Sequence, residues 1–167
     1  LRSKASKVDV LKFLDYVNDL KIAAVMIHGR TLAQGFSGEV DWKIIKKARN
    51  YFSGIILANG GVNSAEDAFS LLEKTEADGI GIGRGALGRP WIFQEIKSRL
   101  KKSDFGYPKS DFGESTEMKK KFILKIALRH AKLAGKLKGD QGIKEMRKHL
   151  CWYVAGLPDA SELRQKL

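Results

Sequence analysis

Residues 78–88, Asp78-Gly-Ile-Gly-Ile-Gly-Arg-Gly-Ala-Leu-Gly88, place a short apolar run directly before a glycine-rich loop. Two earlier apolar runs end in a similar way: residues 22–27 continue into His28-Gly29-Arg30, and residues 54–58 continue into Asn59-Gly60-Gly61. None of the three runs alternates polar with apolar residues, and this pattern is typical of parallel strands that are covered on both faces. The sequence therefore predicts three buried strands, each followed by a loop of unusual composition.

Three segments outside these runs have apolar residues at helical spacing: about residues 8–20, 42–52 and 65–72. Ser64 and Asp67 begin the last of them with the Ser-x-x-Asp pattern of a capping box. A helix followed by three strand–helix units predicts an α/β fold with parallel strands for residues 1–102.

The remainder of the chain has a helical pattern. Residues 103–114 contain turn-forming residues without periodicity and are the predicted linker. Residues 115–167 are predicted to form a small helical domain, with helices over about 115–135, from after Asp140 to Gly156, and after Asp159. The first helix is predicted to place on one face Phe122, Ile126, His130 and Leu133. The second is predicted to bury Ile143, Met146, Leu150 and Val154.

The chain is strongly basic, because 31 Lys and Arg residues against 19 Asp and Glu residues give a formal net charge of +12. Such an excess is typical of proteins that bind nucleic acid, although a solubilising surface has the same composition. Lys144, Arg147 and Lys148 lie at i, i+3 and i+4 on one helical face. This face could follow a phosphate backbone, and a merely solvated face is the alternative.

The single cysteine, Cys151, excludes an intramolecular disulfide and a cysteine-rich metal site, and it favours a reducing, cytoplasmic setting. We interpret Cys151 and His130 as packing residues and expect no metal. No apolar run approaches the roughly 18 residues of a membrane span, so no membrane partner is expected. The sequence begins at Leu1 rather than Met, and we expect that it starts inside a longer protein.

The three strand ends carry the chemistry of a ligand site. Ligands of parallel α/β structures gather beyond the carboxyl ends of the strands, where glycine loops let backbone N–H groups approach an anion. The loop from Gly83 to Gly88 adds Arg84, which can contact a phosphate oxygen, and Asn59-Gly60-Gly61 supplies a second set of donors. Two such loops after consecutive strands match the usual phosphate site of a (β/α)₈ barrel.

Two other features of the strand ends have alternatives. Gly83 to Gly88 also fits the dinucleotide pattern G-x-G-x-x-G, but that pattern belongs after the first strand of its domain, and here two strand–helix units precede it. A Rossmann fold is therefore disfavoured. His28 and Arg30 could hydrogen-bond a cofactor or a substrate, and a structural histidine is the alternative.

Several of these motifs together resemble the tRNA-dihydrouridine synthases. The resemblance includes His28-Gly-Arg-Thr, Ala58-Asn-Gly-Gly and Ile82-Gly-Arg-Gly-Ala-Leu-Gly-Arg-Pro-Trp-Ile-Phe93. It continues beyond the linker in Gly142-Ile-Lys-Glu-Met-Arg-Lys-His-Leu-Cys-Trp-Tyr153, and it extends from about Val8 to Arg164.

The resemblance implies an FMN-binding (β/α)₈ (TIM) barrel, with residues 1–102 as about three of its βα units, and a helical tRNA-binding domain at 115–167. It implies an oxidoreductase in which NADPH reduces the flavin, the flavin passes hydride to C6 of a uracil in tRNA, and a cysteine protonates C5. Carried over to this sequence, the cofactor-binding residues would be His28, Asn59, Gly60, Gly61, Gly83 and Arg84. The residues on the tRNA side would be Arg30, Lys144, Arg147 and Lys148.

The sequence departs from the family pattern in two respects. Gly61 stands where the family often has an acidic residue, so a backbone N–H remains but a carboxylate contact is lost. The family's catalytic cysteine, in an Asn-x-Gly-Cys-Pro context, and its first flavin loop do not occur here, and Cys151 belongs to the helical part. We therefore expect no catalytic residue in this chain and no turnover by its 167 residues alone.

Two other functions remain open from the sequence. The chain could be a non-catalytic, basic RNA-binding module, or part of another FMN- or phosphate-binding barrel oxidoreductase that acts on a small molecule. The basic helical segment counts against the second alternative, because a small substrate gives no reason for it.

Overall fold

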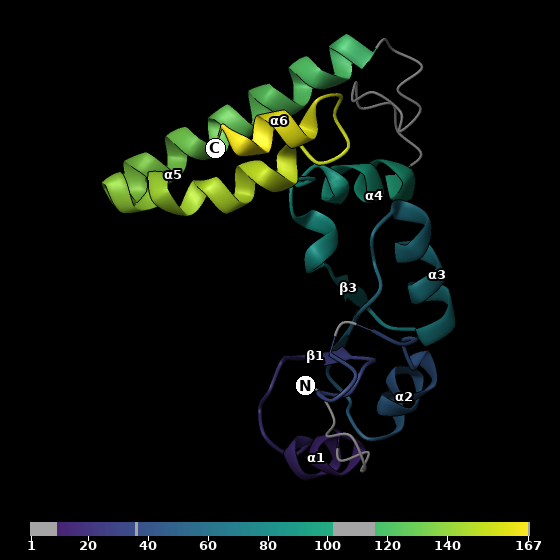
Figure 1. Ribbon diagram of the computed structural model, residues 1–167. Helices are drawn as coiled ribbons and strands as arrows, with labels where there is room; N and C mark the ends of the chain where they lie inside the picture. The colour runs from purple at the N-terminus through teal and green to yellow at the C-terminus, as the bar shows by residue number, and fades with distance from the viewer. Residues whose placement is uncertain (1–9, 36, 102–115, 167) are drawn as a thin grey trace. The chain divides into compact units, whose positions relative to one another are not determined.

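The computed structural model describes residues 10–35, 37–101 and 116–166 (Figure 1). The described chain divides into two compact units, Leu1–Gly85 and Ala86–Leu167. The predicted linker, residues 103–114, lies outside the described residues, so the domain boundaries stay a prediction.

The first unit is a small parallel sheet with helices, as predicted. Its elements are α1 (Val10–Val17), β1 (Ala24–His28), α2 (Trp42–Lys47), the 3₁₀ helix η1 (Ala48–Asn50), β2 (Ile55–Asn59), α3 (Ala65–Thr75) and β3 (Gly79–Gly81). The strands have the order β1-β2-β3, and both neighbouring pairs are parallel. Because parallel neighbours are joined by right-handed crossovers, α2 and α3 lie on the same side of the sheet. These two helices contact each other, and α3 contacts β2 and β3.

Among the described residues, only one face of this sheet is buried, which corrects the expectation of strands covered on both faces. Val25, Ile27, Ile56 and Ala58 are buried beneath the helices. Successive side chains of a strand point to opposite faces. Met26 therefore lies on the other face, where 43% of it is exposed. A continuous apolar run shows that both faces could be buried, but it does not supply the element that would cover the second face.

The start of α3 follows from local sequence chemistry. The Ser64 hydroxyl accepts a hydrogen bond from the Asp67 N–H, and the Asp67 carboxylate accepts one from the Ser64 N–H. This reciprocal pair is the predicted capping box, and it satisfies backbone donors that the first helical turn leaves without partners. The box places the amino end of α3 directly after the loop that follows β2.

The second unit is helical. It contains α4 (Ile92–Lys101), α5 (Thr116–Tyr153) and α6 (Ala160–Gln165), and a short 3₁₀ helix, η2 (Arg84–Ala86), lies where the two units join in the sequence. Within α5, Gly139 has φ 58° and ψ −141°, values outside the helical region. The chain reverses there, and Figure 1 shows the two arms of α5 lying side by side. The two long helices predicted from the sequence are these two arms.

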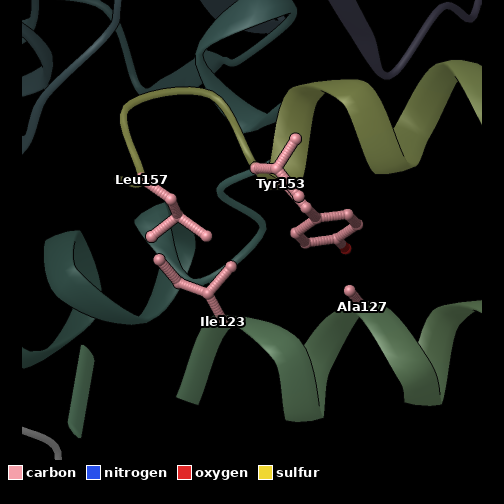
Figure 2. Close-up of a cluster of buried hydrophobic side chains, with 5 residues drawn as sticks. Ile123, Ala127, Tyr153 and Leu157 are labelled. Atoms are coloured by element: carbon pink, nitrogen blue, oxygen red, sulfur yellow. The ribbon is translucent and has the colours of Figure 1, made fainter. Parts of the chain in front are cut away.

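The core of the helical unit lies between the two arms of α5 and the turn that follows them. Its buried members are Ile123, Ala127, Tyr153, Val154 and Leu157. Figure 2 shows Ile123 and Ala127 on the first arm facing Tyr153 and Leu157. Trp91 packs against the cluster, and its ring meets Phe122 edge to face with ring centroids 5.3 Å apart.

In the hairpin, Ile143, predicted to be buried, is exposed, and so is Leu133, predicted to share a face with Phe122, Ile126 and His130. Leu133 is 48% exposed and Ile143 is 52% exposed, whereas Met146 and Val154 are buried as predicted. The backbones of the arms touch near the bend, because a Cβ at Gly142 would collide with the carbonyl oxygen of Ala134. Arms in such close contact leave little room for a large side chain between them, so about half of Leu133 and of Ile143 stays exposed, with the end of the Ile143 side chain close to Gly135.

We predict that Gly142→Ala destabilises the helical unit. The added methyl would meet the backbone of Ala134, and overpacking of this kind typically costs about 1–3 kcal/mol. Gly135→Ala is the matched control, since its Cβ would meet only the end of the Ile143 side chain. That variant should be neutral or gain up to about 1 kcal/mol of helix propensity. Urea unfolding followed by circular dichroism measures both, and equal stabilities would contradict the close contact.

Candidate functional site

The carboxyl ends of the three strands meet in register. His28 on β1 is the partner of Asn59 on β2, and Asn59 is the partner of Gly81 on β3. The Asn59 side-chain amide donates a 2.8 Å hydrogen bond to the Gly81 carbonyl oxygen. The Gly29 N–H donates to the Asn59 carbonyl oxygen at 3.0 Å, which extends the pairing one residue past β1. The structure thus brings together two of the predicted site residues, His28 and Asn59.

These residues lie on the uncovered face of the sheet. Side chains in register on parallel strands point the same way, and His28 has the same parity along β1 as the exposed Met26. A Cβ at Gly81 would lie 2.8 Å from the Asn59 amide nitrogen and 2.6 Å from the Met26 sulfur. Gly81 therefore lets both side chains lie across the end of β3.

The ring of His28 is held by its own loop. Its Nδ1 accepts a 3.0 Å hydrogen bond from the Arg30 N–H. A neutral imidazole that accepts at Nδ1 carries its proton on Nε2, so Nε2 is the donor atom of this ring. The half-buried Arg30 side chain in turn donates from Nε to the Gly38 carbonyl oxygen at 2.8 Å, which ties the two ends of the loop together.

The two predicted glycine loops touch each other. A Cβ at Gly85 would collide with the Val62 carbonyl oxygen, so the loop after β3 closes directly on the loop after β2. Gly60 and Gly61 have φ values of 121° and 75°, which residues with a side chain rarely adopt. A Cβ at Gly83 would meet nothing within 4 Å, so this residue is open to one side. Arg84 is exposed beside it.

The donors of these loops suit an anion. In the part of the chain that the structure describes, the N–H groups of Gly60, Gly61 and Gly83 donate no hydrogen bond to another backbone group. Backbone N–H groups presented by adjacent glycine loops at the carboxyl end of a parallel sheet are a recurrent phosphate site. The residues present therefore fit a phosphate-bearing cofactor.

Val40 belongs to the site, although the sequence analysis did not predict it. Its side chain lies within reach of Gly29, Gly60 and Gly61, so that a Cβ at Gly60 would be 3.2 Å from Val40 Cγ2. The N–H of Asp41, the next residue, donates a 2.8 Å hydrogen bond to the Gly29 carbonyl oxygen, which brings this end of the loop back to the end of β1. Val40 lies far from any strand end in the sequence and carries no motif, so nothing local marks it as a residue that supports the glycine loop.

The predicted basic face lies on the second arm of α5, in the other unit. Lys144, Arg147 and Lys148 are all exposed. Glu145 lies among them, but its carboxylate is hydrogen-bonded by Lys138 at 2.6 Å, and this contact holds the pKa of Glu145 below its usual range. Because Lys138 pairs with the negative charge of Glu145, the three exposed cations leave the face with a net positive charge that suits a polyanion.

A chain of aromatic rings lies beside this face. His149 has ring-centroid distances of 5.1 Å both to His130 and to Trp152. His130 Nδ1 lies 3.3 Å from the Tyr153 hydroxyl oxygen, so the half-buried His130 has a polar partner as expected of a packing residue. Burial, followed by the charges of His130 and Lys148, lowers the pKa of His149. Cys151 is half-buried in the same arm.

The residues that the structure describes offer neither a metal site nor a membrane-spanning helix. They contain no group of three or more His, Cys, Asp and Glu side chains able to hold a metal ion. In the same residues, every helix is too short or too polar to cross a membrane.

Comparison with known proteins agrees with the resemblance at the strand ends. The family model described as dihydrouridine synthase matches residues 1–167. The chain belongs to the dihydrouridine synthase family. It is 40% identical over 147 residues to the probable tRNA-dihydrouridine synthase of Mycobacterium leprae, covering 87% of this chain and 36% of that protein. It is 36% identical over 146 residues to tRNA-dihydrouridine synthase B of Pseudomonas putida, covering 87% and 41%.

This member of the dihydrouridine synthase family aligns with less than half of the length of each of these relatives. The probable tRNA-dihydrouridine synthase 1 of Synechocystis is 32% identical over 161 residues, which are 96% of this chain and 43% of that protein. The chain thus corresponds to between 36% and 43% of the length of these curated proteins. The matched stretches include both units, and therefore both the strand-end loops and the basic arm.

We predict that a fall in pH lowers the free energy of unfolding of the helical unit, because His149 becomes protonated. Because the folded pKa is lowered from its usual 6.5, the unfolded chain binds a proton more readily. The stability is therefore fully present above about pH 6.5 and is lost as the pH falls through the folded pKa. Urea unfolding from pH 8 to pH 5 should show this loss, and His149→Phe should reduce it. The groups that face His149 are His130, Lys148, Glu145 and Lys138.

The control for this experiment is His28→Asn, in the other unit, which should leave the dependence of the helical signal on pH unchanged. An identical acid slope in the original chain and in His149→Phe would show that His149 is not the responsible group.

Proposed function

We propose that the chain is part of an enzyme that reduces uridine to 5,6-dihydrouridine in tRNA, using FMN with NADPH as the reductant. One observation carries this proposal: His28, Asn59 and two contacting glycine loops converge on one edge and one face of a parallel sheet. The reaction is inferred from family membership, since similar proteins of the family are named tRNA-dihydrouridine synthases. The setting proposed for it is the cytoplasm.

The fold proposed for the first part is a portion of a (β/α)₈ barrel. Residues 1–102 would supply about three βα units, 103–114 a linker, and 115–167 a helical tRNA-binding domain. The one-sided burial of β1 and β2 supports this proposal, because barrel strands carry helices outside and layered side chains inside. Met26 and Ile55, which are 43% and 50% exposed, would belong to that interior.

FMN, when bound, supplies the hydride-transfer chemistry of an isoalloxazine ring. Its phosphate would be held by the N–H groups of Gly60, Gly61 and Gly83, with the Arg84 guanidinium adding a charge-assisted hydrogen bond. Asn59 would hold the end of β3 in place through its bond to Gly81. His28 would donate from Nε2 to the cofactor, because Nδ1 is engaged by the Arg30 N–H. Arg30 would lie toward the substrate.

The tRNA would be bound in part by the second arm of α5, through Lys144, Arg147 and Lys148. These side chains are exposed on one arm, and Lys and Arg bind nucleic-acid backbones through their phosphates. No residue of this chain is proposed as the acid that protonates C5 of uracil. Its one cysteine, Cys151, is half-buried in α5.

We predict that the chain binds FMN about tenfold more tightly than riboflavin, since only FMN offers a phosphate to the glycine loops. Arg84→Gln should weaken FMN binding and leave riboflavin binding unchanged. Lys74→Gln is the matched control, because Lys74 is an exposed cation in the last turn of α3, before the amino end of β3. Quenching of flavin fluorescence measures the affinity of each of the three chains for FMN and for riboflavin. Equal binding of FMN and riboflavin would contradict the phosphate site.

We also predict that the 167-residue chain, mixed with FMN, NADPH and unmodified tRNA, binds the tRNA without reducing it. The reason is that the chain holds the proposed cofactor and tRNA contacts but no candidate proton donor for C5. Mass spectrometry of the recovered nucleosides detects dihydrouridine as a gain of two hydrogen atoms. Formation of dihydrouridine would contradict the proposal that none of these residues is the proton donor for C5 of uracil. Salt-sensitive tRNA binding without FMN binding would favour the alternative of a non-catalytic RNA-binding module.

A further inference from the structure

An exposed tryptophan ends a row of cations on the second arm of α5. Lys144, Lys148 and Trp152 are spaced i, i+4 and i+8, so their side chains lie along one stripe of the helix. Trp152 is 38% exposed, and both lysines are exposed. Neither lysine forms an ion pair within the described parts of the chain. The row thus combines two exposed positive charges with one partly exposed indole.

The indole of Trp152 is braced by its neighbours. The His149 ring meets it edge to face at a centroid distance of 5.1 Å and a 73° interplanar angle. His149 is itself in contact with His130, whose Nδ1 lies 3.3 Å from the Tyr153 hydroxyl. Behind the indole, the main chain of Trp152 is in close contact with Gly88, where a Cβ would collide with it. Trp152 is therefore held in place although a large part of its surface is accessible.

We propose that Trp152 is a stacking platform for an unpaired nucleobase of the RNA whose phosphates contact Lys144 and Lys148. This inference rests on the proposed binding of RNA by the helical unit and adds the part of the RNA that is recognised. Aromatic rings stack on bases that are not enclosed in a duplex, and the braced indole loses little conformational entropy when it does so. The lysines of the row favour a polyanion over an apolar protein partner.

The test compares single-stranded and double-stranded RNA on the intact 167-residue chain. Trp152→Leu removes the aromatic face but keeps an apolar side chain. It should weaken binding of a single-stranded octamer about tenfold, the effect expected for one lost base–aromatic stack. Binding of the same sequence as a duplex should not change, because its bases are already stacked on one another. Replacing Lys144 and Lys148 together by Gln should weaken both complexes and reduce their salt dependence.

Two further variants separate stacking from structure. Trp152→Phe should restore most of the single-strand affinity, since phenylalanine also stacks. Leu128→Ala is the matched control for losing an exposed apolar group, because Leu128 is 56% exposed on the other arm of α5. It should change neither complex. An octamer with abasic positions should bind the original chain and Trp152→Leu equally.

A spectroscopic measurement keeps the test valid if Trp152→Leu fails to fold. In the chain labelled with 5-fluorotryptophan, the ¹⁹F resonance of Trp152, assigned by its absence in Trp152→Phe, should shift with the single strand and not with the duplex. A Trp152 resonance that does not move, or equal losses for both RNAs in Trp152→Leu, would overturn the inference while RNA binding persists. Failure of the original chain to bind either RNA would overturn the proposed RNA function as well.

Discussion

The in-register pairing of β1, β2 and β3 is the constraint on which the candidate site depends. It places His28 beside Asn59 and Asn59 beside Gly81, and the Asn59 amide fixes this end of the sheet by its bond to the Gly81 carbonyl. A slip of one residue would turn His28 onto the buried face, because the side-chain period of a strand is two. The loops that carry the glycines and Arg84 start from these strand ends, so their convergence follows from the same register.

Direct contact between backbones sets the remaining distances. Gly85 lies against the Val62 carbonyl, Gly88 against the main chain of Trp152, and Gly142 against the Ala134 carbonyl. Each contact excludes a Cβ, so each requires glycine for close approach, and Gly88 also has a φ of 69°, which favours glycine. The first contact joins the two loops of the proposed phosphate site. The second braces the residue proposed to stack on a base, and the third holds the arms of the α5 hairpin together.

The sequence predicted the parts of this structure that short-range chemistry determines. The capping box at Ser64 and Asp67, the three strands and the gathering of His28 with Asn59 all follow from local patterns or from the rule for parallel strand ends. The exposure of Leu133 and the support that Val40 gives to Gly60 could not be predicted. Both depend on which distant backbone approaches, and the same apolar residue at the same spacing is compatible with either environment.

On the uncovered face of the sheet, the side chains change from apolar to polar toward the carboxyl ends of the strands. This change connects the fold with the proposed function. Ile55 and Met26 make the face apolar along the strands, while Asn59 and His28 make it polar at the carboxyl edge. Burial of such a side chain is worth about 1.5–3 kcal/mol, so leaving both half-exposed forfeits much of the stabilisation that their side chains offer. An apolar interior with polar groups at its carboxyl rim is the organisation of a (β/α)₈ barrel. Enclosing that face would bury Met26 and Ile55 and would shield the rim from water, which would strengthen the contacts proposed there for His28 and Arg84.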